Sequence, residues 1–168
     1  GWDSAKTAIA QEQAPLYQAF LEKVIKLRGE DDPLVWRARE YYAACLALQT
    51  RMDVEEQRDG SWALNLRDQA REQLEQVADS QAATLGAFHP ATLKTRKTLP
   101  FLYKPVRVGI TNTLGRRAVA EMEEILQAEI TLWGENHPAV EETCIRLGSL
   151  YHEFGFPAKS VECTHRAI

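Results

Sequence analysis

A five-residue pattern, Gly-x-x-His/Asp-Pro, occurs three times in this chain and limits the folds that the chain can adopt. It reads GEDDP at 29–33, GAFHP at 86–90 and GENHP at 134–138. Glycine accommodates the left-handed backbone conformation that commonly ends a helix. An aspartate or histidine side chain can cap the next helix, and proline is favoured at the first position of a helix. Each copy therefore predicts the end of one helix, a turn and the start of another.

Apolar residues at helical spacing precede every copy of the pattern, and a second helical segment follows each proline. Such a stripe of side chains needs a neighbouring element to pack against. The sequence therefore predicts helices arranged in consecutive pairs. The stripes comprise Leu16, Phe20, Leu21, Val24, Ile25 and Leu27 before the first copy, Leu66, Ala70, Leu74, Val77, Ala78 and Leu85 before the second, and Val119, Met122, Leu126, Ile130 and Trp133 before the third.

These pairs resemble the tetratricopeptide repeat (TPR), a helix–turn–helix unit. More narrowly, they are similar to the repeats of kinesin light chains, which open with Gly-x-x-His-Pro. The resemblance implies an all-α fold, a right-handed TPR-like α-solenoid of about seven helices in helix-turn-helix pairs. It is strongest over 134–168, and the residues that carry it there are Gly148 at the contact between paired helices, Tyr151 within the pair, Gly155 at the turn and Ala167 in the second helix.

Length and spacing define the expected domain organisation. The 168 residues are expected to form a single TPR-like domain, 1–168, and to be a piece of a longer protein. The expected order is a helix over 1–28 and then units at roughly 29–85, 86–133 and 134–168. The proline-to-proline intervals are 57 and 48 residues, above the ~34 of the basic repeat, which predicts enlarged loops at 53–61 and 104–117. Pro100 falls inside an expected helix and should kink it or move its start.

The resemblance also implies where a ligand would bind. In TPR proteins the first helix of each unit lines a concave surface, and peptide-contacting positions lie on that helix away from the packing residues. Carried over to this chain, these positions are Arg37 in the first unit, Lys94, Lys97, Phe101 and Lys104 in the second, and Glu142, Ile145, Ser149 and His152 in the third.

Charge is distributed unevenly and suggests the nature of that ligand. Residues 80–120 contain seven basic and no acidic residues, whereas the rest of the chain has 13 basic and 24 acidic residues. Such a local field attracts partners of opposite charge, which favours an acidic peptide with an apolar or aromatic anchor. The alternative is that the basic window is solvated surface that complements the acidic remainder. Nucleic acid is disfavoured because the pI is near 5.6.

The sequence offers little for catalysis. His89 and His137 belong to the turns, and neither His152 nor His165 has ligands at metal-binding spacing. A phosphate-binding glycine loop, a nucleophile elbow and paired carboxylates are all missing from the sequence. The three cysteines are odd in number and suit free thiols in a reducing compartment. We therefore expect a cytoplasmic, non-enzymatic protein without a cofactor, a bound metal or a membrane span.

The leading hypothesis is a protein–protein interaction scaffold or adaptor that binds a peptide segment in its concave groove. A cytoskeleton-associated role follows only from the similarity to kinesin light chains, and fold-level analogy is weak support for a function. Two alternatives remain open. The chain could be the helical regulatory lobe of a larger enzyme, such as a SET/MYND-type methyltransferase, whose helical domain is also TPR-like. It could also be a structural repeat module that associates with itself.

Overall fold

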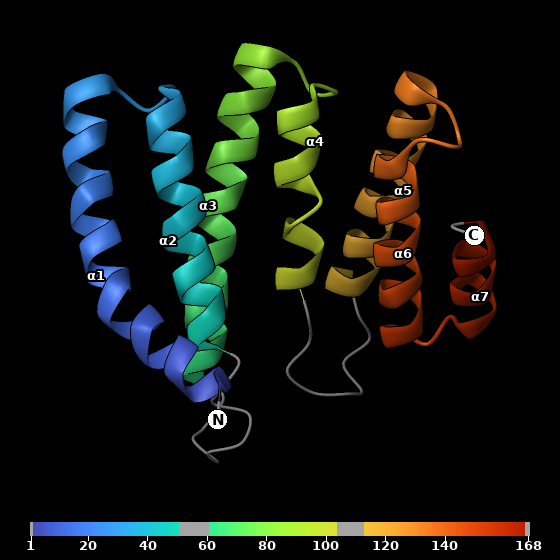
Figure 1. Ribbon diagram of the computed structural model, residues 1–168, viewed down its shortest axis with the longest axis horizontal. Helices are drawn as coiled ribbons and strands as arrows, with labels where there is room; N and C mark the ends of the chain where they lie inside the picture. The colour runs from blue at the N-terminus through green and yellow to red at the C-terminus, as the bar shows by residue number, and fades with distance from the viewer. Residues whose placement is uncertain (1, 51–60, 104–112, 167–168) are drawn as a thin grey trace. The chain divides into compact units, whose positions relative to one another are not determined.

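The computed structural model describes residues 2–50, 61–103 and 113–166 of the chain (Figure 1). It divides into two compact units, Gly1–Thr95 and Arg96–Ile168. All regular elements in the described residues are helical, namely seven α-helices and one short 3-10 helix, η1. The expected all-α fold of about seven helices is therefore confirmed.

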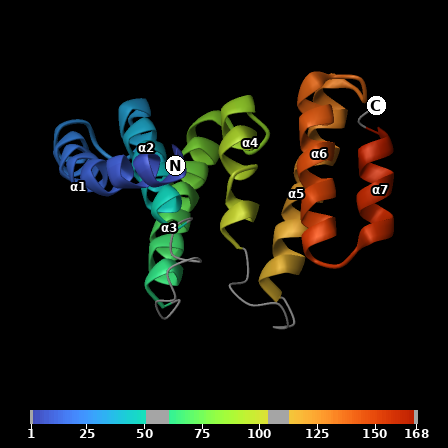
Figure 2. The same cartoon turned by 60° about the horizontal axis from the view of Figure 1, so that its bottom comes forward.

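Each unit is built from helices that pack on their neighbours along the chain. In the first unit, α2 packs against both α1 and α3. In the second, α6 packs against both α5 and α7, and η1 packs against α5 (Figure 1, Figure 2). The elements are α1 (Trp2–Arg28), α2 (Pro33–Gln49), α3 (Ser61–Leu85), α4 (Pro90–Arg96), η1 (Leu99–Leu102), α5 (Thr113–Trp133), α6 (Pro138–Glu153) and α7 (Pro157–Arg166).

The three copies of the repeated pattern form the same helix–turn–helix junction. In each copy the glycine has a positive φ of 83°, 103° or 83°, and its N–H donates to the carbonyl oxygen four residues earlier. The aspartate or histidine before the proline accepts a hydrogen bond from the N–H two residues later, which caps the following helix. These caps are Asp32 Oδ1 with Leu34 N at 2.8 Å, His89 Nδ1 with Ala91 N at 3.2 Å, and His137 Nδ1 with Ala139 N at 3.1 Å.

A buried polar contact also repeats between the helices that flank two of these junctions. The threonine five residues after the proline donates to a side chain five residues before the glycine. Thr143 Oγ1 lies 2.5 Å from Glu129 Oε2, and Thr95 Oγ1 lies 2.8 Å from Gln81 Oε1. The same positions in the first copy hold Val24 and Ala38, which are buried in an apolar cluster. The three junctions therefore bring equivalent positions of the flanking helices together. The contact is a buried hydrogen bond in the second and third copies and apolar packing in the first.

Pro100 interrupts the helix that the sequence predicts after Pro90. Helix α4 ends at Arg96, and the chain continues as the 3-10 helix η1, which contains the buried Pro100. This break confirms the expected distortion, because proline cannot donate a helical hydrogen bond and clashes with the preceding turn.

Two sequence-based expectations need correction. First, the loops expected at 53–61 and 104–117 are shorter at their C-terminal ends, because α3 begins at Ser61 and α5 begins at Thr113. The remaining residues of these expected loops, 53–60 and 104–112, lie outside the described residues. Second, the stripe predicted on α1 is only partly buried: Leu21 and Val24 are buried and Ile25 is half-buried against α2, as expected, but Leu16, Phe20 and Leu27 are exposed. The buried line continues instead through Ala10 and Ala14, which the predicted stripe did not include and which pack beside Cys45 of α2.

Candidate functional site

One side of α6 carries a row of exposed side chains at helical spacing. Glu142, Ile145, Ser149 and His152 follow one another at intervals of three or four residues, so they project from the same face. An open hollow lies on this face, which we call the α6 face. Its lining comprises Ile145, Gly148, Ser149, His152, Glu153 and Ser160.

Helix α7 forms the far wall of the hollow. Ser160 Oγ donates a 2.8 Å hydrogen bond to the carbonyl oxygen of Gly148. This bond joins α7 to α6 at a glycine, a position where α6 has no side chain. Ile145 is 51% exposed, so its apolar side chain is accessible to a ligand. The hollow thus combines an accessible apolar side chain with the hydroxyl of Ser149 and the imidazole of His152.

An ion cluster borders the α6 face. Lys97 Nζ lies 2.9 Å from Glu129 Oε1 and 3.6 Å from Glu142 Oε2, and Arg146 Nη2 lies 2.8 Å from Glu142 Oε1. The guanidinium of Arg146 also stacks over the ring of Phe101 at 5.5 Å. Lys97 and Glu129 are only 9% and 1% exposed, so their charges compensate each other inside the unit.

The carboxyl of Glu142 shows the influence of this cluster. Partial burial by itself raises its pKa, but the hydrogen bond from Arg146 and the charges of Lys97 and Arg146 outweigh that effect. The net result is a pKa below the usual range of glutamate. Glu142 is therefore ionised at neutral pH and partners both cations.

The structure brings some of the predicted site residues together and separates others. Ile145, Ser149 and His152 line one hollow, and Glu142 lies on the same face of α6. The ring of Phe101 contacts the guanidinium of Arg146, which borders that face. Lys97 is buried in its ion pairs and does not present a free charge to a ligand. Arg37 and Lys94 occupy exposed positions of α2 and α4 in the other compact unit, and Lys104 lies outside the described residues.

Three of the five described basic residues of the 80–120 window, Arg96, Lys97 and Arg117, are engaged within the second unit. Arg96 contacts Glu121 at 3.5 Å and Glu124 at 3.2 Å, and the guanidinium of Arg117 lies 5.3 Å from the centre of the Tyr103 ring. The sequence analysis did not predict that Glu121 and Glu124 pair with Arg96, although their spacing places them on adjacent turns of α5. The local positive field is therefore weaker than the count of basic residues suggests.

We expect the Glu121→Gln variant to be more stable than the wild type at neutral pH. Burial raises the pKa of the Glu121 carboxyl, and the charge and hydrogen bond of Arg96 only partly offset this effect. A raised pKa in the folded state means that ionisation opposes folding, so stability falls as pH rises through that pKa. The gain should vanish when the pH falls below the ordinary pKa of glutamate. Urea unfolding across acid to neutral pH measures it.

Glu124→Gln is the matched control, because Glu124 contacts the same guanidinium but is 58% exposed. Removal of an exposed ion pair should change the free energy of unfolding by at most about 1 kcal/mol. A Glu121→Gln variant that is less stable than the wild type at neutral pH would contradict the account.

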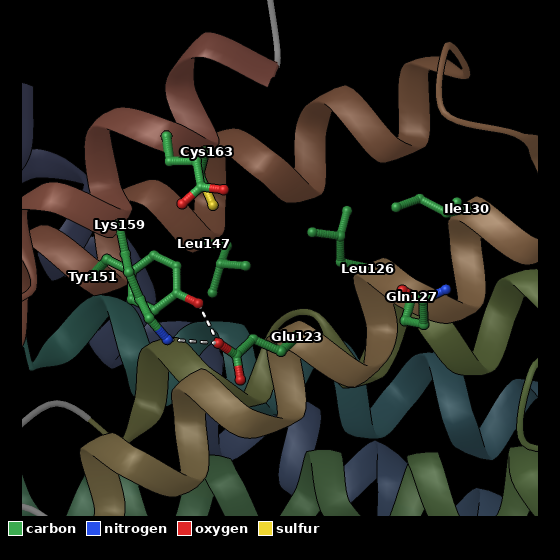
Figure 3. A pocket seen from close by; sticks show the side chains of 9 residues that line it. Glu123, Leu126, Gln127, Ile130, Leu147, Tyr151, Lys159 and Cys163 are labelled. Carbon is green, nitrogen blue, oxygen red and sulfur yellow. Dashed lines mark hydrogen bonds and ion pairs between the residues drawn. The ribbon is translucent and has the colours of Figure 1, made fainter.

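A second cavity opens between α5, α6 and α7 (Figure 3). The hydroxyl of Tyr151 donates to Glu123, and Lys159 Nζ lies 3.5 Å from the same carboxylate. Burial, followed by the hydrogen bond and charge of Glu123, raises the pKa of Tyr151 well above its ordinary value. Tyr151 therefore stays protonated and acts as a donor that links α6 to α5, which is a structural arrangement.

The described residues hold no group of three or more histidine, cysteine, aspartate or glutamate side chains that could bind a metal ion. Their helices also include none that is long and apolar enough to cross a membrane.

Comparisons with known proteins identify the fold. No protein-family model and no curated protein matches the chain. Among solved structures, BtubC (BKLC) from P. vanneervenii aligns with a TM-score of 0.69 and 19% identity over 95% of this chain. The aligned part is 56% of the BtubC chain, so this sequence spans little more than half the length of that protein.

A Podosopora anserina protein, described as a kinesin light chain with nearly identical TPR-like repeats, is similar over more of its length. Its two structures align with a TM-score of 0.51 and 18% identity, over 98% of this chain and 92% of theirs. The chain therefore has a TPR-like helical-repeat fold, as the repeated junctions indicated.

Proposed function

We propose that this chain is a non-catalytic scaffold that binds a peptide segment of a partner protein on the α6 face. The observation that carries the proposal is the open hollow around Ile145, where an accessible apolar side chain stands beside Ser149 and His152. Helical-repeat proteins generally bind through a surface that one helix of each pair lines. The TPR-like fold supports a protein partner, and the hollow supports a particular place on that fold.

The chemistry of the hollow suggests the form of the peptide. An apolar side chain of the peptide would lie on Ile145. The Ser149 hydroxyl donates to the carbonyl oxygen of Ile145 at 3.1 Å and can accept from a peptide N–H, and the His152 imidazole can also bond to the peptide backbone. An acidic residue next to that anchor would compete with Glu142 for Arg146. Because Glu142 and Glu129 already compensate the nearby cations, we propose that the acidic preference is secondary to the apolar anchor.

The nature of the partner is a further part of this proposal. The kinesin light chain description of one similar structure supports motor- and cytoskeleton-associated proteins as the first partners to test. The cytoplasmic location stays a prediction.

The test uses fluorescently labelled peptides with a central Leu or Trp, flanked either by Asp and Glu or by Ser and Gly, and measures anisotropy. We expect binding that requires the central anchor and that Ile145→Asp weakens at least about tenfold. Leu132→Asp is the matched control, because Leu132 in α5 of the same unit is 48% exposed, against 51% for Ile145.

Three outcomes would count against the proposal. Peptides without the anchor could bind equally well, both variants could lose binding alike, or none of the peptides could bind. A dependence on acidic flanks but not on the anchor would also contradict it and would indicate binding at basic residues outside the α6 face.

A further inference from the structure

Helix α1 exposes an apolar stripe that the described residues of its own unit do not cover. Ile9, Leu16, Phe20 and Leu27 are 51%, 70%, 45% and 74% exposed. At about 100° per residue, these four side chains project within about 20° of one line along the helix. The residues that pack on α2 lie on a different line, so the stripe is free for a partner.

The stripe has the spacing of a coiled-coil seam. Ile9, Gln13, Leu16, Phe20, Lys23 and Leu27 alternate at intervals of four and three residues, which keeps a seam facing a second helix. Four of these six positions are apolar, and the two polar positions stand symmetrically about the middle of the stripe.

This symmetry matches the stripe to a second copy of itself running antiparallel. With the two-fold axis level with the midpoint between Leu16 and Phe20, Leu16 lies opposite the partner's Phe20. In the same register Ile9 lies opposite the partner's Leu27. The polar Gln13 then lies opposite the partner's Lys23, so every apolar position meets an apolar position and no charge is placed against a methyl group.

Charge complementarity selects the antiparallel arrangement over the parallel one. Exposed Glu12 and Lys26 flank the same edge of the seam, and the antiparallel register places Glu12 beside the partner's Lys26 twice, once on each side of the axis. A parallel pair in register would instead place Lys23 against the partner's Lys23. Like charges at facing positions are destabilising, whereas opposite charges fix orientation.

Pro15 lies within α1, and the helix bends in its N-terminal half (Figure 1). Proline on a helix removes one backbone hydrogen bond and commonly produces such a bend. The central contact between Leu16 and Phe20 follows Pro15 in both copies, so the middle of the seam lies in the unbroken part of the helix. Ile9, Glu12 and Gln13 precede Pro15, so each outer contact joins a residue before the proline in one copy to a residue after it in the other.

We propose that the chain forms an isologous dimer through antiparallel pairing of α1 with α1 of a second copy. The Leu16–Phe20 contacts form its centre and the Glu12–Lys26 pairs its edges. This surface lies in the first compact unit, whereas the α6 face lies in the second, so the dimer and the peptide-binding function can be tested independently of each other.

Sedimentation velocity over a concentration series of the 168-residue chain tests the proposal. We expect mass to rise from monomer to dimer and to stop there. Phe20→Glu should weaken the dimer by at least about a hundredfold, because the change enters the interface twice. Leu64→Glu is the matched control, since Leu64 in α3 of the same unit is 43% exposed, and it should leave the dimer intact.

A charge swap tests the register without loss of apolar area. Glu12→Lys should weaken the dimer about tenfold, and adding Lys26→Glu should restore it. Orientation is tested by mixing Glu12→Cys protein with Lys26→Cys protein, which should cross-link to each other faster than either does to itself.

Several results would overturn the proposal. A monomer at every concentration would do so, as would a dimer that withstands Phe20→Glu or one that Leu64→Glu weakens equally. Failure of the charge swap to restore the dimer would refute the antiparallel register. Circular dichroism of each variant shows whether the fold is retained. If Phe20→Glu does not fold, the Glu12→Lys and Glu12→Lys/Lys26→Glu variants test the proposal in its place.

Discussion

Replacement of Lys97 by methionine is expected to lower the free energy of unfolding by about 3–5 kcal/mol. Glu129 is 1% exposed and its carboxylate depends on Lys97 at 2.9 Å and on the hydroxyl of Thr143. Without Lys97 a charge would remain buried with a single neutral donor, which is costly in a low-dielectric interior. Chemical denaturation followed by circular dichroism measures the loss.

Two comparisons separate this buried pair from an ordinary ion pair. The double variant Lys97→Met/Glu129→Leu should recover most of the stability, because both charges are then removed and Thr143 still donates to the carbonyl oxygen of Ala139. Lys159→Met breaks an exposed pair with Glu123 and should cost at most about 1 kcal/mol. A Lys97→Met variant as stable as Lys159→Met would show that the Glu129 charge is not buried.

Truncation of Leu150 to alanine is expected to cost about 2–5 kcal/mol. Leu150 is fully buried in the apolar cluster that joins α5, α6 and α7, together with Met122, Leu147 and Tyr151. The loss combines the transfer free energy of the deleted methyl groups with the cavity that remains, because a close-packed interior relaxes only partly. Thermal and urea unfolding measure it.

Ile145→Ala is the matched control for this prediction. Ile145 lies on the same helix but is 51% exposed, so its truncation should cost less than about 1 kcal/mol. Equal losses in the two variants would contradict the assignment of one face of α6 to the core and the other to solvent.

The repeated junctions made most of the fold predictable from sequence. Glycine, a capping side chain and proline each act on the local backbone, so their order alone indicates where helices end and begin. Gly134, His137 and Pro138 occupy the conformations that their chemistry favours. The interruption at Pro100 followed from the same local rule.

The parts that failed depend on contacts between helices. On α1, periodicity grouped the buried Leu21 and Val24 with the exposed Leu16, Phe20 and Leu27, because it does not rank two neighbouring faces. The buried line is continued by small alanines, Ala10 and Ala14, that pack against α2. Likewise, counting charges near Lys97 did not reveal its partners, because Glu129 and Glu142 approach it only through the packing of α5 and α6. Both failures concern tertiary partners rather than local structure.

Amide NMR with a labelled chain shows whether the α6 face binds a peptide segment. The probe is a short peptide with a central Leu flanked by Asp and Glu, titrated into the 168-residue protein. We expect chemical-shift changes concentrated at Ile145, Ser149 and His152 and at their neighbours on α7, and we expect Ile145→Asp to abolish them. Shifts confined to the cavity around Glu123 and Tyr151, or no shifts at saturating peptide, would contradict this expectation.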